Sequence, residues 1–325
     1  MRAAVVHEYG PPSGVVVEDL PSPVPGAGQA VVQISAAAVN FADVLVIANR
    51  YQHPAPVPFT PGSEFAGTVT AVAQDVDGVR PGDRVLGTVF VGAFAEEVVA
   101  SVASLTHLPA SVEFTVAVAG GVAYATSYHA LRSVAAVRPG EWVVVLGAAG
   151  GVGLAAVQLA HLMGARVVAA ASSAEKLAVC AEHGADALIN YETEDLKERI
   201  RLLTGGGADV IIDPVGGRYA EPALRASRWG ARFVTLGFAA GEIPRIPLNL
   251  VLLKGVVVMG MEIWGFSTHQ AEETRRDRAE LMELLGSGRL QPYISATHDL
   301  DDVVAALETV AGRRATGKVL ITPSS

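Results

Sequence analysis

Cysteine, charge and aromatic side chains are all scarce in this 325-residue sequence. The single cysteine, Cys180, excludes an intrachain disulfide and any zinc-binding lobe that needs several cysteine ligands. Because Cys180 falls within a helical pattern at 174–183, we expect a buried, apolar thiol. Only 18% of the residues are charged and half are hydrophobic, which is typical of a globular chain long enough for two cores.

Positive charge is the scarcer sign, with 24 Lys and Arg against 33 Asp and Glu. A net charge of −9 argues against a sequence-independent nucleic-acid binder and against a basic membrane-surface protein. The most apolar long stretch, 142–160, is interrupted by glycines, which indicates a buried strand–turn–helix unit rather than a membrane span. His7 and Glu8 come too early for a signal peptide, so we expect a cytoplasmic protein.

The strongest pattern present is an apolar, β-branched run that ends in the glycine cluster Gly-Ala-Ala-Gly-Gly-Val-Gly at 147–153. An apolar helical segment, 154–163, follows directly. Such a strand, turn and helix can cradle a dinucleotide pyrophosphate, since glycines let the backbone approach and the helix start attracts negative charge. The spacing departs from G-x-G-x-x-G, because Ala148 stands where the first glycine belongs if Gly150 and Gly153 are the second and third.

Two regions differ in their periodicity. Residues 1 to about 110 contain short apolar runs between Pro/Gly turns, which predicts a compact, barrel-like β domain. An Ala-rich helical stretch at 115–134 leads into alternating strands and helices, which predicts an α/β region with a doubly wound parallel sheet. The predicted strands of this region are 142–147, 166–171, 187–190, 209–213, 232–237 and 256–263.

The remaining elements complete this division of the chain. Helices are predicted at 154–163, 174–183, 194–203, 219–227 and 270–285, and a last helix capped by Asp299 runs to Val310. The last strand, 318–322, is expected to return to the β domain. We therefore expect a substrate domain of 1–122 and 291–325, and a dinucleotide-binding domain of 123–290.

The residues after strand 166–171 indicate which dinucleotide is bound. An NAD site usually has an acidic residue at this strand end, whereas here Ser172 and Ser173 follow, with Lys176 close behind. Hydroxyls and a lysine suit a 2′-phosphate, so the sequence favours NADPH over NADH. Alternatively, Ser172 and Glu175 form a capping box, and both readings can hold because a capped helix start is also an anion site.

Residues 147–153 resemble the medium-chain dehydrogenase/reductase superfamily, specifically its zinc-independent, zeta-crystallin-like quinone oxidoreductase branch. The resemblance covers nearly the whole chain, with further matching motifs at 38–43, 61–67, 79–85, 92–96 and 316–319. It implies a GroES-like β-barrel catalytic domain joined to a Rossmann domain, NADPH as cofactor, and a homodimer. The apolar edge-strand candidate 256–263 could pair with its symmetry mate, or it could be an interior strand.

The resemblance also implies roles for individual residues. Asn40 is expected near the nicotinamide ribose and Thr126 near the nicotinamide or a phosphate. Tyr191 and Arg314 are expected beside the 2′-phosphate, although Tyr191 could be strand-end packing and Arg314 part of a solvated pair. The pyrophosphate is expected to contact Gly150, Gly151 and Val152, and the 2′-phosphate is expected to contact Ser172, Ser173 and Lys176. Val215, Leu236, Gly237 and Phe238 should line the path from the adenosine to the nicotinamide, although Phe238 could also be core. Ile263, Trp264 and Gly265 should approach the nicotinamide end of the cofactor.

Metal ligands are not expected. Zinc enzymes of the superfamily carry a cysteine and a Gly-His-Glu turn where this sequence has Asn40 and Ser63, and the eight histidines are scattered. Without a Lewis acid, hydride must pass to an acceptor that is already electrophilic. Tyr51 is a candidate for substrate contact and proton donation, or it packs within its loop. Asp43 is a candidate for orienting the Asn40 loop, or it caps a helix.

Three hypotheses follow. The first is an NADPH-dependent quinone oxidoreductase, and the second is a C=C reductase of enals, enones or enoyl-CoA. The third is an NADPH-binding protein with little turnover, serving a structural, RNA-binding or sensing role. Asn40, Thr126 and Tyr51 favour catalysis, and the acidic pI argues against RNA. The sequence leaves the physiological substrate open.

Overall fold

The computed structural model describes residues 1–323, and the chain divides into two compact units. Unit 1 comprises Met1–Val122 and Leu285–Ser325, and unit 2 comprises Ala123–Leu284. The chain thus returns to unit 1 at Leu285, earlier than the expected 291. Packing explains this, because a Cβ on Gly120 would lie 2.9 Å from both methyl groups of Leu285.

Unit 1 is built on a seven-stranded sheet of order β14-β15-β3-β4-β5-β7, with β6 also paired to β3. Strand β15 runs antiparallel to β3, pairing Val319 with Val39, so the end of the chain completes the N-terminal sheet. A separate two-stranded sheet joins β1 to β2. The strands are β1 Arg2–Val6, β2 Val15–Asp19, β3 Gln29–Val39, β4 Glu64–Val72, β5 Arg84–Thr88, β6 Glu97–Ser101, β7 Leu105–His107, β14 Ile294–Asp299 and β15 Lys318–Thr322.

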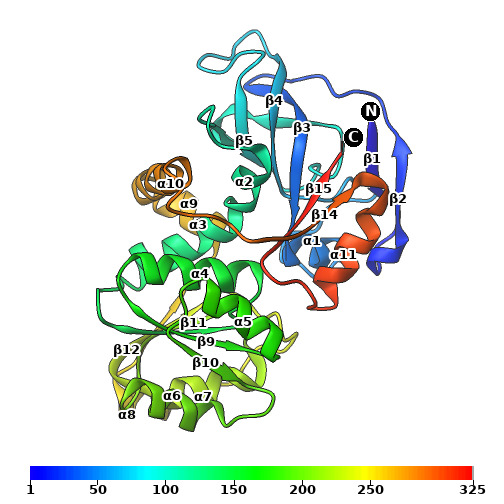
Figure 1. Cartoon of the computed structure of the whole chain (residues 1–325). Coiled ribbons are helices and arrows are strands. Elements are labelled where there is room, and N and C mark those ends of the chain that lie inside the picture. Colours follow the sequence, from blue (N-terminus) through cyan, green and yellow to red (C-terminus); the bar gives the residue numbers. More distant parts are fainter. Residues whose placement is uncertain (324–325) are drawn as a thin grey trace. The chain divides into compact units, whose positions relative to one another are not determined.

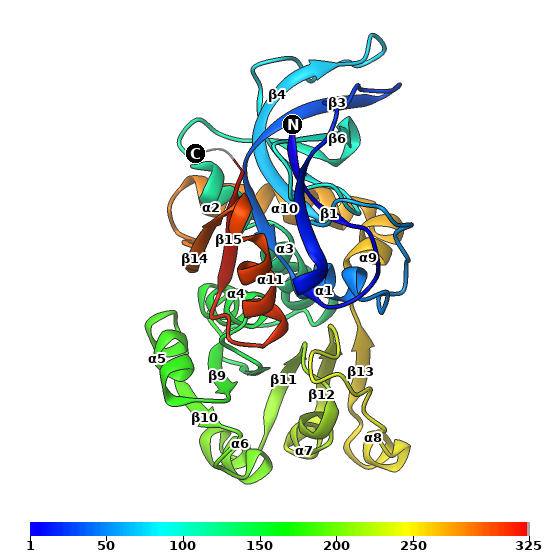
Figure 2. The ribbon, with the colours of Figure 1, turned by 90° about the vertical axis from the view of Figure 1, so that its right-hand side faces the viewer.

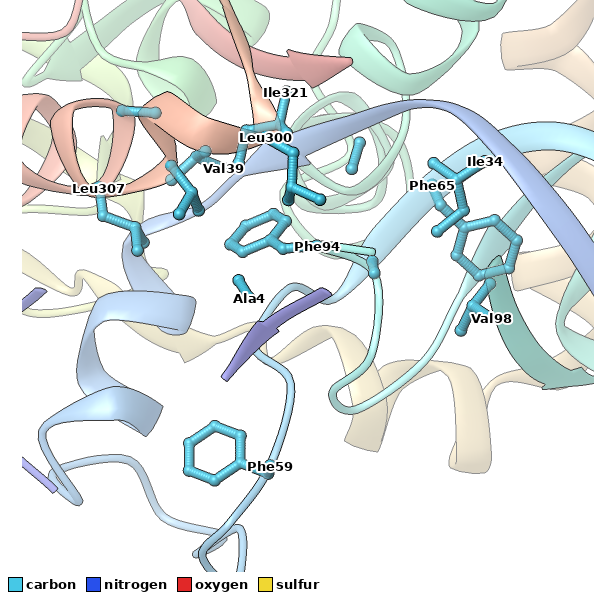
Figure 3. Packing of buried hydrophobic residues seen from close by; sticks show 14 of the residues in the cluster. Ala4, Ile34, Val39, Phe59, Phe65, Phe94, Val98, Leu300, Leu307 and Ile321 are labelled. Atoms are coloured by element: carbon cyan, nitrogen blue, oxygen red, sulfur yellow. The ribbon is translucent and has the colours of Figure 1, made fainter. Parts of the chain in front are cut away.

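Three short helices, α1 Phe41–Ile47, α2 Phe114–Ala119 and α11 Val303–Ala311, belong to unit 1. Its apolar core joins strand residues to α11. Figure 3 shows Phe94 close to Val39 of β3 and Leu307 of α11, and all three are buried. This core fixes the end of β3, from which the chain enters α1.

Unit 2 contains a six-stranded sheet of order β10-β9-β8-β11-β12-β13, in which every neighbouring pair is parallel. This is the doubly wound order 3-2-1-4-5-6, so the predicted sheet is confirmed. Helices α4 and α5 lie on one face and α6 and α7 on the other (Figure 1). The strands are β8 Trp142–Leu146, β9 Arg166–Ala171, β10 Ala187–Asn190, β11 Ala208–Asp213, β12 Ser227–Thr235 and β13 Val257–Gly260; the helices are α4 Gly151–Leu162, α5 Ala174–Glu182, α6 Leu196–Thr204, α7 Ala220–Arg225, α8 Leu248–Lys254, α9 Ile263–His269 and α10 Ala271–Gly286.

Parallel strands end at the same edge of their sheet, and Figure 2 shows the strands of unit 2 side by side. The residues that follow β8, β9, β10, β11 and β12 therefore gather along one edge. These are the positions of the glycine cluster and of most of the predicted cofactor-binding residues.

The predicted strand 256–263 is too long. Strand β13 ends at Gly260, and Ile263 begins α9 instead. The carboxylate of Glu262 caps this helix by accepting hydrogen bonds from the Trp264 and Gly265 N–H groups at 2.9 and 2.7 Å. The cap ends the extended conformation although the residues remain apolar.

The predicted helix 115–134 is three segments: α2, α3 Val122–Tyr128 and a π-helix His129–Val134. A Cβ on Gly121 would lie 2.5 Å from Glu64 Oε2, so the chain turns at the two glycines between α2 and α3. Asp299 does not cap α11, because the 3-10 turn Leu300–Asp302 intervenes. Cys180 is buried as expected, and burial raises its pKa to about 12.

Candidate functional site

In unit 1, Asn40 stands at the start of α1, directly after β3. Its backbone N–H donates to Asp43 Oδ2 at 2.7 Å. The two alternatives for Asp43 are therefore the same interaction, since capping α1 is what orients the Asn40 segment.

The Asn40 side chain belongs to a buried charged cluster with Glu64 and Lys318. Lys318 Nζ lies 2.8 Å from Asn40 Oδ1 and 2.8 Å from Glu64 Oε1. Asn40 Nδ2 donates to the same Glu64 oxygen at 2.8 Å. The Glu64 and Lys318 side chains are 0% and 3% exposed, so the pair is shielded from water and the Asn40 amide is held at both ends.

Sequence reasoning quoted Glu64 and Lys318 only as members of motifs and missed this role. The sequence did contain a signal for this role. Glu64 is the one charged residue of β4 and Lys318 the one charged residue of β15, and each stands at the start of its strand. A charge buried in this way needs an opposite charge and hydrogen bonds. Glu64 Oε2 also accepts the Val122 N–H at 2.6 Å, so the backbone of Val122 bonds to the same cluster.

Asp43 lies beside this cluster and is itself buried. Burial, and to a lesser degree the charge of Glu64, raises its pKa to about 7. The Asn40 N–H, the Ser63 side chain and Lys318 act in the opposite direction. Asp43 therefore exchanges a proton near neutral pH, unlike an ordinary aspartate.

Tyr51 packs within a group of rings. Its ring is stacked with Phe90 at 6.5 Å between centroids and lies edge-on to His53 at 6.4 Å. The structure thus contains the packing role foreseen for this residue. Substrate contact and proton donation by Tyr51 stay predictions.

In unit 2, the glycine cluster joins β8 to α4. Gly147 has a φ of +58°, so it makes the tight turn that the sequence pattern had placed at Ala148. A Cβ on Gly153 would lie only 2.2 Å from the Gly147 carbonyl oxygen, so only glycine lets α4 start against the end of β8. Gly150 is the N-cap and, as a glycine, offers no side chain to accept the first N–H groups of the helix. The N–H groups of Gly151 and Val152 open the helix, as an anion site requires.

The residues after β9 bring a hydroxyl and an ammonium group together. Lys176 Nζ lies 3.3 Å from Ser172 Oγ. Ser173, in an extended conformation, is the N-cap of α5, and its Oγ accepts the Lys176 N–H at 3.4 Å. The alternative in which Ser172 caps this helix together with Glu175 is therefore wrong, because the cap is the next residue, Ser173. Ser172 is left beside the lysine.

Tyr191 follows β10 and lies next to the end of β9, because its N–H donates to the Ala171 carbonyl at 3.1 Å. Its ring packs on Tyr219 with 4.3 Å between centroids. The strand-end packing foreseen for Tyr191 is thus present. Its position at this edge is also the one that a residue beside the 2′-phosphate would need.

The segment after β11 meets the glycine cluster on one side and the segment after β12 on the other. A Cβ on Gly147 would lie 2.6 Å from a methyl group of Val215, and one on Gly216 would lie 2.8 Å from the Phe238 ring. Phe238 is 38% exposed, so it is not core. Leu236 and Gly237 connect β12 to Phe238.

Thr126, Arg314 and α9 complete the predicted set. Thr126 precedes Ser127, whose hydroxyl donates to the Val152 carbonyl at 2.8 Å and so holds α3 against the start of α4. Arg314 belongs to unit 1, where its guanidinium donates to the Glu308 carbonyl at 3.3 Å. Ile263, Trp264 and Gly265 form the first turn of α9. The ligand contacts of all five stay predictions.

Comparison with known proteins decides the family. Residues 26–110 match the alcohol dehydrogenase GroES-like domain, and residues 151–286 match a family described as zinc-binding dehydrogenase. Quinone oxidoreductase-like protein 2 homolog of Nematostella vectensis is 39% identical over 98% of this chain and 88% of that protein. The chain belongs to the medium-chain dehydrogenase/reductase superfamily, in its zeta-crystallin-like quinone oxidoreductase branch.

Other members of the branch agree. Human quinone oxidoreductase is 30% identical over 99% of this chain and 97% of its own length. The crystal structure of Escherichia coli quinone oxidoreductase complexed with NADPH has a TM-score of 0.94, with 28% identity and 99% and 100% coverage of the two chains. The expected combination of a GroES-like domain and a Rossmann domain is therefore confirmed.

One of the two matching families is described as zinc-binding, which makes the ligand-type side chains of this chain relevant. Residues 1–323 contain no group of three or more His, Cys, Asp or Glu side chains that could hold a metal ion. At the position where zinc enzymes carry a cysteine, the Asn40 amide bonds to Lys318 and Glu64, and a lysine ammonium is a hydrogen-bond donor rather than a ligand. The donor set does not fit a catalytic zinc.

Proposed function

We propose that this chain is an NADPH-dependent oxidoreductase that transfers hydride to a quinone. The proposal rests on two features that lie at the carboxyl edge of the unit 2 sheet. There the open start of α4 follows the glycine cluster, and the Ser172 hydroxyl lies 3.3 Å from the Lys176 ammonium. One feature suits a pyrophosphate and the other suits a 2′-phosphate.

The choice of NADPH over NADH rests on Ser172 and Lys176. Substituting Lys176 by Ala removes the ammonium group and is expected to weaken NADPH binding about tenfold while leaving NADH binding unchanged. Lys197→Ala is the matched control, since that lysine pairs with Glu198 on the surface of α6. Equal losses for both dinucleotides, measured by calorimetric titration, would contradict the assignment.

The reduction of a quinone to a hydroquinone needs one hydride and one proton, and NADPH supplies the hydride when bound. Asn40 uses one Nδ2 hydrogen on Glu64 and has the other to offer to the cofactor ribose. Glu64 and Lys318 hold that amide in place before the ligand arrives, which is how a rigid site aligns reactants. The Tyr51 hydroxyl or solvent supplies the proton that completes the hydroquinone.

We also propose that the reaction is metal-independent, because the amide of Asn40 and the charge of Lys318 fill the region where a zinc site would be built. A quinone is already electrophilic, so it needs no Lewis acid to accept hydride. Activity that survives treatment with EDTA supports this part of the proposal.

A second copy of this chain is proposed as a partner. Strand β13 is at the end of the unit 2 sheet, and its Val257 and Val258 are 46% and 49% exposed. Trp229, which is 77% exposed, packs against Gly255 beside this strand. An exposed apolar sheet edge favours pairing with a symmetry mate. Light scattering should give a dimer, and Val258→Lys should give a monomer.

The test of the proposed function is NADPH consumption by purified, EDTA-treated protein, followed by absorbance. The acceptors are para-benzoquinone and phenanthrenequinone, beside crotonyl-CoA and hexenal, with NADH as the parallel donor. Quinone turnover that prefers NADPH is expected. Turnover of the enoyl compounds alone would assign the protein to the C=C reductases, and NADPH binding without turnover would favour a non-catalytic role.

A further inference from the structure

Asp213 is a buried carboxylate at the carboxyl end of β11 that no part of the proposed chemistry uses. It is 0% exposed. Its Oδ1 accepts two backbone hydrogen bonds, from the Val215 N–H at 2.9 Å and the Gly216 N–H at 2.8 Å. Its Oδ2 is buried and, within residues 1–323, has no hydrogen-bond partner. A buried carboxylate is costly, so its retention at this edge needs an explanation.

The turn that Asp213 holds is conformationally demanding. Gly216, with φ +66° and ψ −143°, and Gly217, with φ +56°, both have positive φ values that favour glycine. The N–H groups of Val215 and Gly216 converge on Asp213 Oδ1, and converging N–H groups are stabilised by an anionic acceptor. The carboxylate of Asp213 supplies that acceptor, so the turn depends on it more than an ordinary loop would.

The same turn organises a second segment. The Asp213 carbonyl accepts the Leu236 N–H at 2.8 Å, and the carbonyl of Val215 accepts the Ala240 N–H at 2.8 Å. Phe238 lies between these two bonds in the sequence and packs on Gly216. On its other side, Val215 packs against Gly147 of the glycine cluster. Residues 213–217, residues 236–240 and the cluster are therefore one connected structure.

We propose that Asp213 is a positioning residue for the cofactor, which holds 214–217 and 236–240 in the conformation that NADPH binding requires. The inference rests on the proposed NADPH-dependent function and adds a residue that makes no contact with the cofactor itself. Asp213 acts through the Val215 and Gly216 backbone, and Val215 and Phe238 are the side chains whose placement depends on it.

At position 213, a protonated carboxyl group and the carboxamide of an asparagine would each offer one oxygen to the two backbone N–H groups. Burial raises the pKa of Asp213 above its ordinary value, whereas the two N–H donors lower it. An asparagine keeps one oxygen for the two N–H groups, and its amide nitrogen replaces an oxygen that has no partner. Asn is therefore the conservative substitution, and Ala removes the acceptor.

The experiment measures the NADPH dissociation constant of the wild-type chain, D213A and D213N by calorimetric titration. D213A is expected to bind about tenfold more weakly, and D213N within about threefold of wild type. At saturating NADPH, the kcat of D213A with a quinone should stay within about threefold of wild type, because only cofactor binding is affected.

Asp209 provides a matched control at the amino end of the same strand. Its carboxylate accepts the Trp142 N–H at 2.8 Å and pairs with Arg228 at 3.1 Å, far from the edge where the cofactor is proposed to bind. D209A is expected to lower the melting temperature without changing NADPH affinity. If D209A weakened NADPH binding as much as D213A, or if D213A bound normally, the inference would be overturned.

Gly216→Ala is a second route, usable if D213A does not fold. Its Cβ would meet the Phe238 ring at 2.8 Å and strain a positive-φ position, separating the two segments without removing the carboxylate. Weaker NADPH binding by this variant supports the inference, and unchanged binding contradicts it. A wild-type chain that binds no NADPH would instead overturn the proposed function itself.

Discussion

The two candidate regions are built by opposite physical means. In unit 1, Asn40 is held by the buried ion pair of Glu64 and Lys318, which joins residues 254 positions apart in the sequence. In unit 2, the cradle at 147–153 consists of glycines and backbone N–H groups within one short segment. A buried charge pair is strong only when complete, whereas a glycine turn is limited by sterics. The two regions should therefore fail differently when they are substituted.

The largest effect is expected from Lys318→Met. This change leaves the Glu64 carboxylate buried without its counter-charge and is expected to cost about 3–5 kcal/mol of unfolding free energy. The Asn40 amide also loses a donor, so activity should fall with stability. Denaturant titration and steady-state kinetics are the measurements.

The double variant E64L/K318M separates the two consequences. Replacing both charges by apolar groups should recover most of the stability. Activity should stay low, because the Asn40 amide has then lost both its partners. Full recovery of activity would contradict the positioning role of the pair.

A smaller effect is expected from Gly153→Ala in unit 2. The new Cβ would lie 2.2 Å from the Gly147 carbonyl oxygen, so the backbone must move, at a cost of about 1–3 kcal/mol. Gly150→Ala is the control, because its nearest contact would be an ordinary 3.5 Å. Gly150→Ala should fold normally and lose NADPH affinity alone, since its methyl group would occupy the approach of the pyrophosphate.

The comparison between G153A and G150A is read from melting temperature and NADPH titration together. Loss of stability in both variants would show that the steric account of the turn is wrong. Equal NADPH affinity of G150A and wild type would show that the ligand does not approach this backbone.

The sequence was informative where the structure is local. The glycine cluster and the alternation of strands and helices lie within short windows, so a parallel, doubly wound sheet could be predicted from 142–237. The error at 256–263 is also local in origin. An apolar run continues through Ile263, but the Glu262 carboxylate takes the N–H groups that a strand would use, and a helix begins.

The buried groups could not be read in this way. Glu64 and Lys318 become partners only because β15 pairs with β3 and β3 with β4. Nothing in the sequence around Asp213 indicates that its carboxylate is buried and accepts hydrogen bonds from two backbone N–H groups. Long-range strand pairing decides the contact of Glu64 with Lys318. The bonds of Asp213 are local, but its burial follows from the place of β11 between β8 and β12, of which a single sequence contains no record.

The last expected effect is a pH dependence of the stability of unit 1 that arises from Asp43. Burial raises the pKa of Asp43 from its ordinary 3.8 to about 7, so the folded chain binds a proton there that the unfolded chain releases. The stability from this group is fully present below about pH 4 and is lost as pH rises to about 7. Asp43→Asn should flatten the fall in melting temperature across that window by on the order of 5 °C. Calorimetry at several pH values measures this, and parallel curves for the two proteins would show that Asp43 does not titrate in this range.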